Sequence, residues 1–329
     1  MNIEELRTSL LNTNKNGYTR ITAEQKAEMN DYCKAYMAFM DAAKTEREAT
    51  TWAVEAAKAR GFVELKPGMD AKPGDKVYLN NRDKSIILAV VGKQPLSAGA
   101  NICAAHVDSP RMDIKPNPLY EDSEIAYLKT HYYGGIKKYQ WVTIPLALHG
   151  VVCRKDGTVV TVNIGEDVND PVLYVTDLLP HLAADQMQKT GGQIIAGEQL
   201  NIVMGTEPLE GEGSDLVKLH VMKLLNEKYG IIEADFLSAE LCIVPAGKCR
   251  EVGLDRSLIG AYGHDDRVCA YAEMEALFNI DVPEKTAVCV LADKEETRCG
   301  LCAWFGGLAS DYQAHTRERD PLRAGLFAA

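Results

Sequence analysis

The sequence predicts an α/β protein that carries a β-rich insertion. Thr22 and Thr45 are each followed three residues later by Gln or Glu, which is the capping-box pattern of a helix start. Apolar runs at 86–91 and 288–291 have the length and residue types of buried strands. Between about 115 and 249 the pattern changes to short strands separated by Gly, Asp and Asn turns. Together these patterns predict an α/β domain interrupted by a β-rich one.

Periodicity and turn residues place the individual elements. In the α/β part we expect helices at 22–40, 45–60 and 267–280. We expect strands at 76–81, 85–92, 100–106 and 286–293, the first two joined as a hairpin. These strands are apolar enough that both faces of their sheet should be covered. In the insertion we expect strands at 139–154, 158–165 and 241–247 and a helix at 214–230.

Composition narrows the possible partners and the compartment. The 329 residues carry a formal net charge of -11, which argues against nucleic acid or an anionic membrane because either would favour a basic surface. The N-terminal stretch lacks the basic start and apolar core of a signal peptide, and the longest apolar runs are too short to cross a bilayer. Nine cysteines, an odd number scattered through apolar segments, suit reduced thiols in a cytoplasmic protein.

Acidic residues and one histidine follow the predicted strands or precede a predicted helix. These candidate site residues are His106, Asp108, Asp265, Asp266, Glu295 and Glu296. Ligands of open α/β sheets bind outside the carboxyl ends of the strands, so the fold could gather all of these residues in one crevice. Imidazole and carboxylate groups are ligands for zinc. A carboxylate such as Asp265 could bridge two metals, one of the glutamates could ligate, and the other could take a proton from water.

Simpler interpretations of the same residues remain open at this point. A His-x-Asp pair at a strand end often makes only a structural hydrogen bond. Two aspartates before a helix often cap its N-terminus and complement its dipole. A Glu-Glu pair after a strand is usually a solvated turn, although the buried run before Glu295 weakens that interpretation.

Long stretches around these residues resemble one known family. They are 106–121 ("HVDSPRMDIKPNPLYE"), 131–152, 244–278 and 290–296 ("VLADKEE"). From about Thr45 to Glu296 the chain resembles the M18 family of metallo-aminopeptidases, in its aspartyl aminopeptidase group and bacterial branch. The resemblance implies a zinc-peptidase-type catalytic domain at 1–114 and 250–296, an inserted β-rich dimerisation domain at 115–249, and an atypical tail at 297–329.

The resemblance also implies roles for the site residues. His106 and Glu296 match metal ligands, Asp265 the aspartate that bridges two zinc ions, and Glu295 the general base. Asp108 and Asp266 match positions that support the ligands without touching the metals. His131 matches a region that approaches the neighbouring subunit's active site in the family, although a plain surface or core histidine is an equal alternative.

The sequence after Glu296 departs from the family pattern. An Ile-Gly-Ser turn, a later aspartate ligand and a histidine ligand are expected there, but residues 297–329 read differently, with arginine and no lysine. A shifted reading frame or a divergent terminus would both produce this. His315 is more simply a solvated residue, and Cys299 with Cys302 resembles half of a zinc site or a redox pair, with no second pair nearby. We therefore expect a truncated or frame-shifted chain with impaired activity.

The function implied is a cytoplasmic, zinc-dependent aminopeptidase. It would remove N-terminal residues, typically Asp or Glu, from peptides, and would assemble as a homo-oligomer that builds from dimers to a dodecamer. Two other classes stay open. One is a non-catalytic remnant that serves as an assembly or binding subunit. The other is a metal-dependent amidohydrolase that acts on acylated amino acids.

Overall fold

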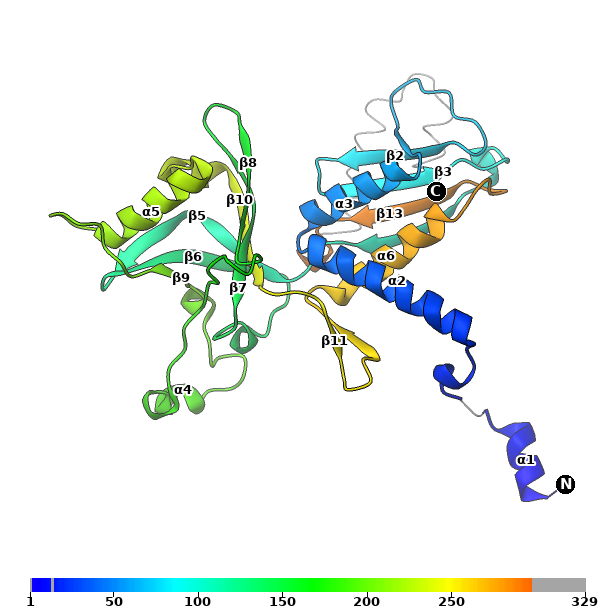
Figure 1. The fold of residues 1–329 in the computed structure, drawn as a ribbon, viewed down its shortest axis with the longest axis horizontal. Helices are drawn as coiled ribbons and strands as arrows, with labels where there is room; N and C mark the ends of the chain where they lie inside the picture. The colour runs from blue at the N-terminus through cyan, green and yellow to red at the C-terminus, as the bar shows by residue number, and fades with distance from the viewer. Residues whose placement is uncertain (1, 13–14, 298–329) are drawn as a thin grey trace.

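The computed structural model describes residues 2–12 and 15–297, and these form two lobes (Figure 1). We call residues 23–106 and 264–297 the α/β lobe and residues 111–245 the β-rich lobe. Between them in sequence lies a two-stranded hairpin, β11 (Arg250–Val252) and β12 (Leu258–Gly260). Helix α1 (Ile3–Leu10) buries no residue and stands apart from both lobes in Figure 1.

The α/β lobe packs helices on a sheet that the described residues build from five strands. The sheet order is β1-β2-β3-β13-β4, with bounds Val63–Glu64, Lys76–Asn81, Ser85–Val90, Ala287–Ala292 and Asn101–His106. The helices are α2 (Ala23–Ala42), α3 (Glu46–Ala59) and α6 (His264–Phe278). Apolar side chains of β3 and β13 alternate between a large core against these helices and a smaller cluster on the opposite face. The fold class expected of the α/β part is what the structure shows.

The helix starts follow the predicted chemistry. The hydroxyls of Thr22 and Thr45 accept hydrogen bonds from backbone N–H groups three residues later. The side chains of Gln25 and Glu48 in turn accept hydrogen bonds from the backbone N–H groups of the two threonines. In α6 the backbone at Asp265 and Asp266 is not helical, so the regular helix begins at Arg267, where the sequence places it.

The β-rich lobe is built on an antiparallel sheet, to which the described residues contribute six strands. Its order is β8-β7-β10-β5-β6-β9, with bounds Val159–Ile164, Leu146–Cys153, Ala239–Pro245, Arg111–Asp122, Ile125–Tyr133 and Ile202–Gly205. Helix α5 (Leu216–Tyr229) packs on this sheet and ends at Gly230, which has φ +67°. A short helix, α4 (Ala184–Met187), lies in the connection before β9. Short 3-10 helices lie at Gly17–Thr19, Leu96–Ala98, Lys138–Gln140, Pro180–Leu182, Gly197–Gln199, Glu233–Ser238 and Glu295–Thr297.

Three expectations about the strands differ from the structure. Strand β4 is exposed from Asn101 to Ala104, so its sheet is not covered evenly on both faces. The expected strand at 139–154 begins only at Leu146, because 138–140 forms a 3-10 turn. The expected strands also do not include the long strands β5 and β6. Prolines at 116 and 118 make β5 hard to recognise in the sequence, because proline is rare inside strands. A register shift between Ile114 and Leu119, in the pairing of β5 with β6, accommodates them.

Strand β5 crosses the expected domain boundary. It begins at Arg111 and pairs with β10 at Met112 and Asp113, so residue 114 lies within the sheet of the β-rich lobe. The division into domains at 114 and 249 stays a prediction. Within residues 2–12 and 15–297, no helix combines the length and apolar character that a membrane crossing requires.

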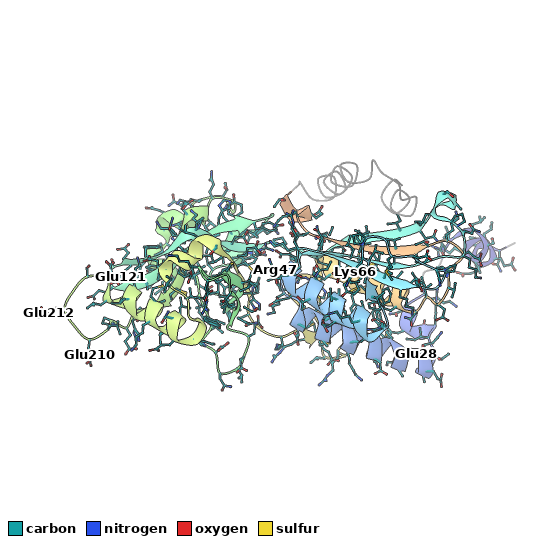
Figure 2. All side chains as sticks on the ribbon, turned by 90° about the horizontal axis from the view of Figure 1, so that it is seen from above. Glu28, Arg47, Lys66, Glu121, Glu210 and Glu212 are labelled. Carbon is teal, nitrogen blue, oxygen red and sulfur yellow. The ribbon has the colours of Figure 1, made fainter. Side chains whose placement is uncertain are left out.

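Charged side chains join the two lobes. Arg111, at the start of β5, donates to both carboxylate oxygens of Glu46 on α3, at 2.6 and 3.2 Å, and both residues are buried. Arg47 forms an ion pair with Glu240 of β10, and Arg47 is labelled between the two lobes in Figure 2. Lys84 lies 3.1 Å from the same Glu240 carboxylate. Ion pairs rather than an apolar core therefore set how the lobes meet.

We expect Glu46→Gln to destabilise the protein by about 3 kcal/mol, because it leaves the buried Arg111 guanidinium without its bidentate partner. Urea unfolding measures the change. A matched control is Glu284→Gln, which breaks an exposed pair with Lys93 and should cost less than about 1 kcal/mol. Equal losses in the two variants would contradict a structural role for the buried pair.

Candidate metal centre

Strand pairing brings the predicted site residues together. Strands β4 and β13 run parallel, with His106 opposite Ala292 in the register. Parallel strands end at the same edge of a sheet, so the glutamates that follow β13 lie beside the histidine that ends β4. The non-helical start of α6 adds Asp265 to the same place, and the Ser109 hydroxyl fixes this stretch by donating to the Asp265 carbonyl oxygen at 3.1 Å.

The ring of His106 is held in one orientation. Its Nδ1 lies 2.9 Å from the carbonyl oxygen of Asp108, which can only accept, so Nδ1 carries a proton. Its Nε2 faces the carboxylates, 3.3 Å from Asp265 Oδ1 and 3.8 Å from Glu295 Oε2. In the neutral ring Nε2 therefore presents its lone pair to the crevice, as a metal-binding histidine does.

Asp108 is fully buried and accepts bonds from several neighbours. The Tyr133 hydroxyl donates to Oδ2 at 2.6 Å, and the backbone N–H groups of Glu295 and Glu296 donate at 3.3 and 3.2 Å. Burial alone would raise the pKa of Asp108, but the bonds from His106, Tyr133 and the Glu296 backbone lower it to about 2. Asp108 therefore stays ionised and ties the histidine segment to the glutamate segment.

Three side chains can converge on one cation. Ligand atoms of His106, Glu295 and Glu296 lie within 4.8 Å of one another. Nitrogen and carboxylate oxygen are donors that zinc accepts, so the described residues fit this metal. Burial and nearby carboxylates raise the pKa of Glu296, although His106 opposes them, which shows a crowded acidic group short of positive charge.

The two aspartates in the non-helical start of α6 have different surroundings. Asp265 is exposed, and its carboxylate reaches His106. Asp266 interacts instead with the thiol of Cys269 and raises its pKa to about 11. The structure thus brings His106, Asp108, Asp265, Glu295 and Glu296 together and places Asp266 in the non-helical stretch just before the regular helix, which begins at Arg267.

Two residues that support this centre are not among those predicted from the sequence. Arg267 is fully buried, and it donates to the carbonyl oxygens of Val107 at 3.1 Å and Lys44 at 2.7 Å. His264 is fixed by the Tyr36 hydroxyl, 2.7 Å from Nδ1, and by a carbonyl oxygen near Nε2. The sequence signal for both is their position beside the Asp-Asp pair. Cys299, Cys302 and His315 lie outside the described residues.

An α/β sheet with histidine and glutamate donors at its carboxyl edge is the arrangement expected of a metal-dependent protein. The comparison with known families then identifies the chain. Residues 39–301 match the family described as aminopeptidase I zinc metalloprotease (M18), and the chain belongs to this family. The family expected from the sequence motifs is confirmed.

Individual relatives and solved structures support membership of the same family. A probable M18 family aminopeptidase 1 of Clostridium acetobutylicum is 50% identical over 292 residues, which cover 87% of this chain and 63% of that protein. An M18 aminopeptidase structure from Thermotoga maritima is 42% identical with a TM-score of 0.86, covering 96% of this chain and 68% of that one. Aminopeptidase I from Clostridium acetobutylicum is 43% identical with a TM-score of 0.82 over 96% and 71%. These structures confirm the peptidase-type α/β fold, and the chain spans about 63% of the curated relative's length.

We expect zinc affinity to rise with pH. Burial alone would lower the pKa of His106, but Asp108 and Glu295 raise it to about 9, so below that pH a proton occupies the Nε2 that zinc needs. Zinc must displace this proton, and affinity should increase about tenfold per pH unit from near neutrality until it levels off above the pKa. Competition against a chromophoric chelator across this range gives the slope. A flat profile would contradict ligation by His106.

We expect Arg267→Met to destabilise the protein. The two buried carbonyl oxygens that Arg267 serves would lose their donor, at about 1–3 kcal/mol each. Chemical unfolding of the metal-free protein measures the loss. The control Arg256→Met removes an exposed arginine paired with Glu251 and should change the free energy of unfolding by less than about 0.5 kcal/mol. A loss at 267 as small as the control's would show that Arg267 does not hold these segments.

Proposed function

We propose that this protein is a zinc-dependent aminopeptidase that removes N-terminal residues, preferably Asp or Glu, from peptides. The observation that carries the proposal is the position of Glu295, whose half-exposed carboxylate lies within reach of His106 Nε2 at the carboxyl edge of the sheet. Membership of the M18 zinc metalloprotease family supports the reaction class. The preference for acidic residues rests on the resemblance of the motifs to the aspartyl aminopeptidase group.

Each site residue would have a separate task. His106 and Glu296 would hold zinc, which when bound polarises a carbonyl and acidifies water. Glu295 would accept a proton from water and pass it to the leaving amine. Asp265, which is exposed and 3.3 Å from His106 Nε2, would bridge to a second zinc ion. Asp108 would keep the imidazole oriented through its carbonyl oxygen, and Asp266 would support the turn that carries Asp265.

We also propose that the enzyme is cytoplasmic and assembles as a homo-oligomer. The cysteines of the described residues include seven free thiols, which suits the reducing cytoplasm. The β-rich lobe exposes apolar side chains at Leu178, Leu179, Leu182 and Met187, which supports its role in homo-oligomer assembly. We also expect the activity to be low, because the sequence after Glu296 departs from the family pattern. Nucleic acid and membranes are not proposed as partners.

We expect Glu295→Gln to lower peptide hydrolysis by at least about 100-fold, because the amide cannot accept the proton from water. The assay compares free Asp- and Glu-terminal peptides with Ala-terminal and N-acetylated ones, with zinc added. Glu284→Gln, which changes an exposed glutamate far from the site, is the control.

The outcomes separate the functional classes. Hydrolysis of free acidic N-termini that Glu295→Gln removes supports the proposed enzyme. Hydrolysis of acylated substrates alone would favour the amidohydrolase. No hydrolysis by the unaltered chain, with an intact oligomer, would favour the non-catalytic assembly subunit.

A further inference from the structure

We propose that the end of β6 in the β-rich lobe, Tyr133 and Gly134, positions two carboxylates of the metal centre in the same chain. These carboxylates are Asp108 and Glu296. The inference rests on the proposed zinc site and adds positioning residues to it. It also gives the β-rich lobe a task beyond assembly, because the lobe would help to set the geometry of the site beside it.

Tyr133 reaches from the β-rich lobe to Asp108, in the segment that joins β4 to β5. Its side chain is buried, and its hydroxyl donates to Asp108 Oδ2 at 2.6 Å. Burial and the charge of Asp108 raise the pKa of the phenol far above its ordinary value, so it remains a donor. Asp108 in turn orients the ring of His106. Residues that hydrogen-bond to a metal ligand without touching the metal fix the orientation of that ligand.

Two cations hold the Tyr133 ring in place. The Arg111 guanidinium lies 4.3 Å from the ring centroid, and the Lys294 ammonium lies 5.0 Å from it. Arg111 is itself anchored on Glu46 of α3 by the buried ion pair. The hydroxyl is therefore aimed by contacts from both lobes, and the ring has little freedom to turn away from Asp108.

Gly134 provides the second contact. At φ +72°, a Cβ built on this residue would lie 2.9 Å from Glu296 Oε2 and 3.1 Å from Glu296 Cβ. It would also lie 3.4 Å from the Cα of Pro110. The glycine thus lets the backbone of the β-rich lobe lie directly against the Glu296 side chain, and any larger residue would push this carboxylate out of place.

Zinc titration of the full chain tests the inference. We expect Tyr133→Phe, which removes only the hydroxyl, to weaken zinc binding by about tenfold or more. Gly134→Ala should weaken it as well. Tyr127→Phe is the control on the same strand, because that ring stacks on Tyr120 away from the site. Gly157→Ala matches the glycine variant, since Gly157 has φ +83° and a Cβ built on it would meet open space.

A double-mutant cycle separates positioning from general stability. If Tyr133 acts through Asp108, its substitution should have little further effect on zinc affinity in an Asp108→Asn background, so the two losses should not add. Circular dichroism and the unfolding midpoint without metal confirm that the variants fold. Additive losses, or the same affinity for Tyr133→Phe and Tyr127→Phe, would overturn the positioning role and leave the zinc site standing. No zinc binding by the unaltered chain would overturn the proposed site and this inference together.

Discussion

The arrangement of the site depends on one buried carboxylate. Asp108 is fully buried, yet it remains ionised because hydrogen-bond donors from separate segments converge on it. The backbone N–H groups of Glu295 and Glu296, the Tyr133 hydroxyl and His106 Nδ1, at 3.4 Å, all surround this carboxylate. A buried charge without such partners would cost several kcal/mol. The segments that carry the site are therefore held together by the requirement to satisfy this single charge.

The same requirement explains why the glutamates can follow a buried strand. His106, with its raised pKa, supplies positive charge to Glu295 and Asp265. The compensation is incomplete. Burial and then the charge of Glu46 raise the pKa of Asp293 to about 6, and Asp293 Oδ1 has no partner among the described residues. Within the candidate site itself, burial and nearby carboxylates raise the pKa of Glu296, and a divalent cation would supply positive charge there.

Local sequence signals were sufficient for part of this structure. Capping boxes at Thr22 and Thr45 and the hairpin of β2 and β3 depend on neighbouring residues, and they could be predicted. The meeting of His106 with Glu295 followed from a rule about parallel strand ends. Long-range partners could not be predicted this way. Nothing in the local pattern marks Arg267 as buried, because its acceptors at Val107 and Lys44 are brought to it only by the fold.

The charged joint between the lobes has a consequence for the site. His149 of β7 lies 2.8 Å from Glu48 and 3.1 Å from Glu166, and Lys44 lies 2.6 Å from the same Glu166. Buried pairs of this kind add little net stability over apolar contacts, but they allow only a narrow range of geometries. An apolar interface between the lobes would tolerate small sliding movements of one lobe against the other. A joint of paired charges resists them, and this keeps Tyr133 at hydrogen-bonding distance from Asp108.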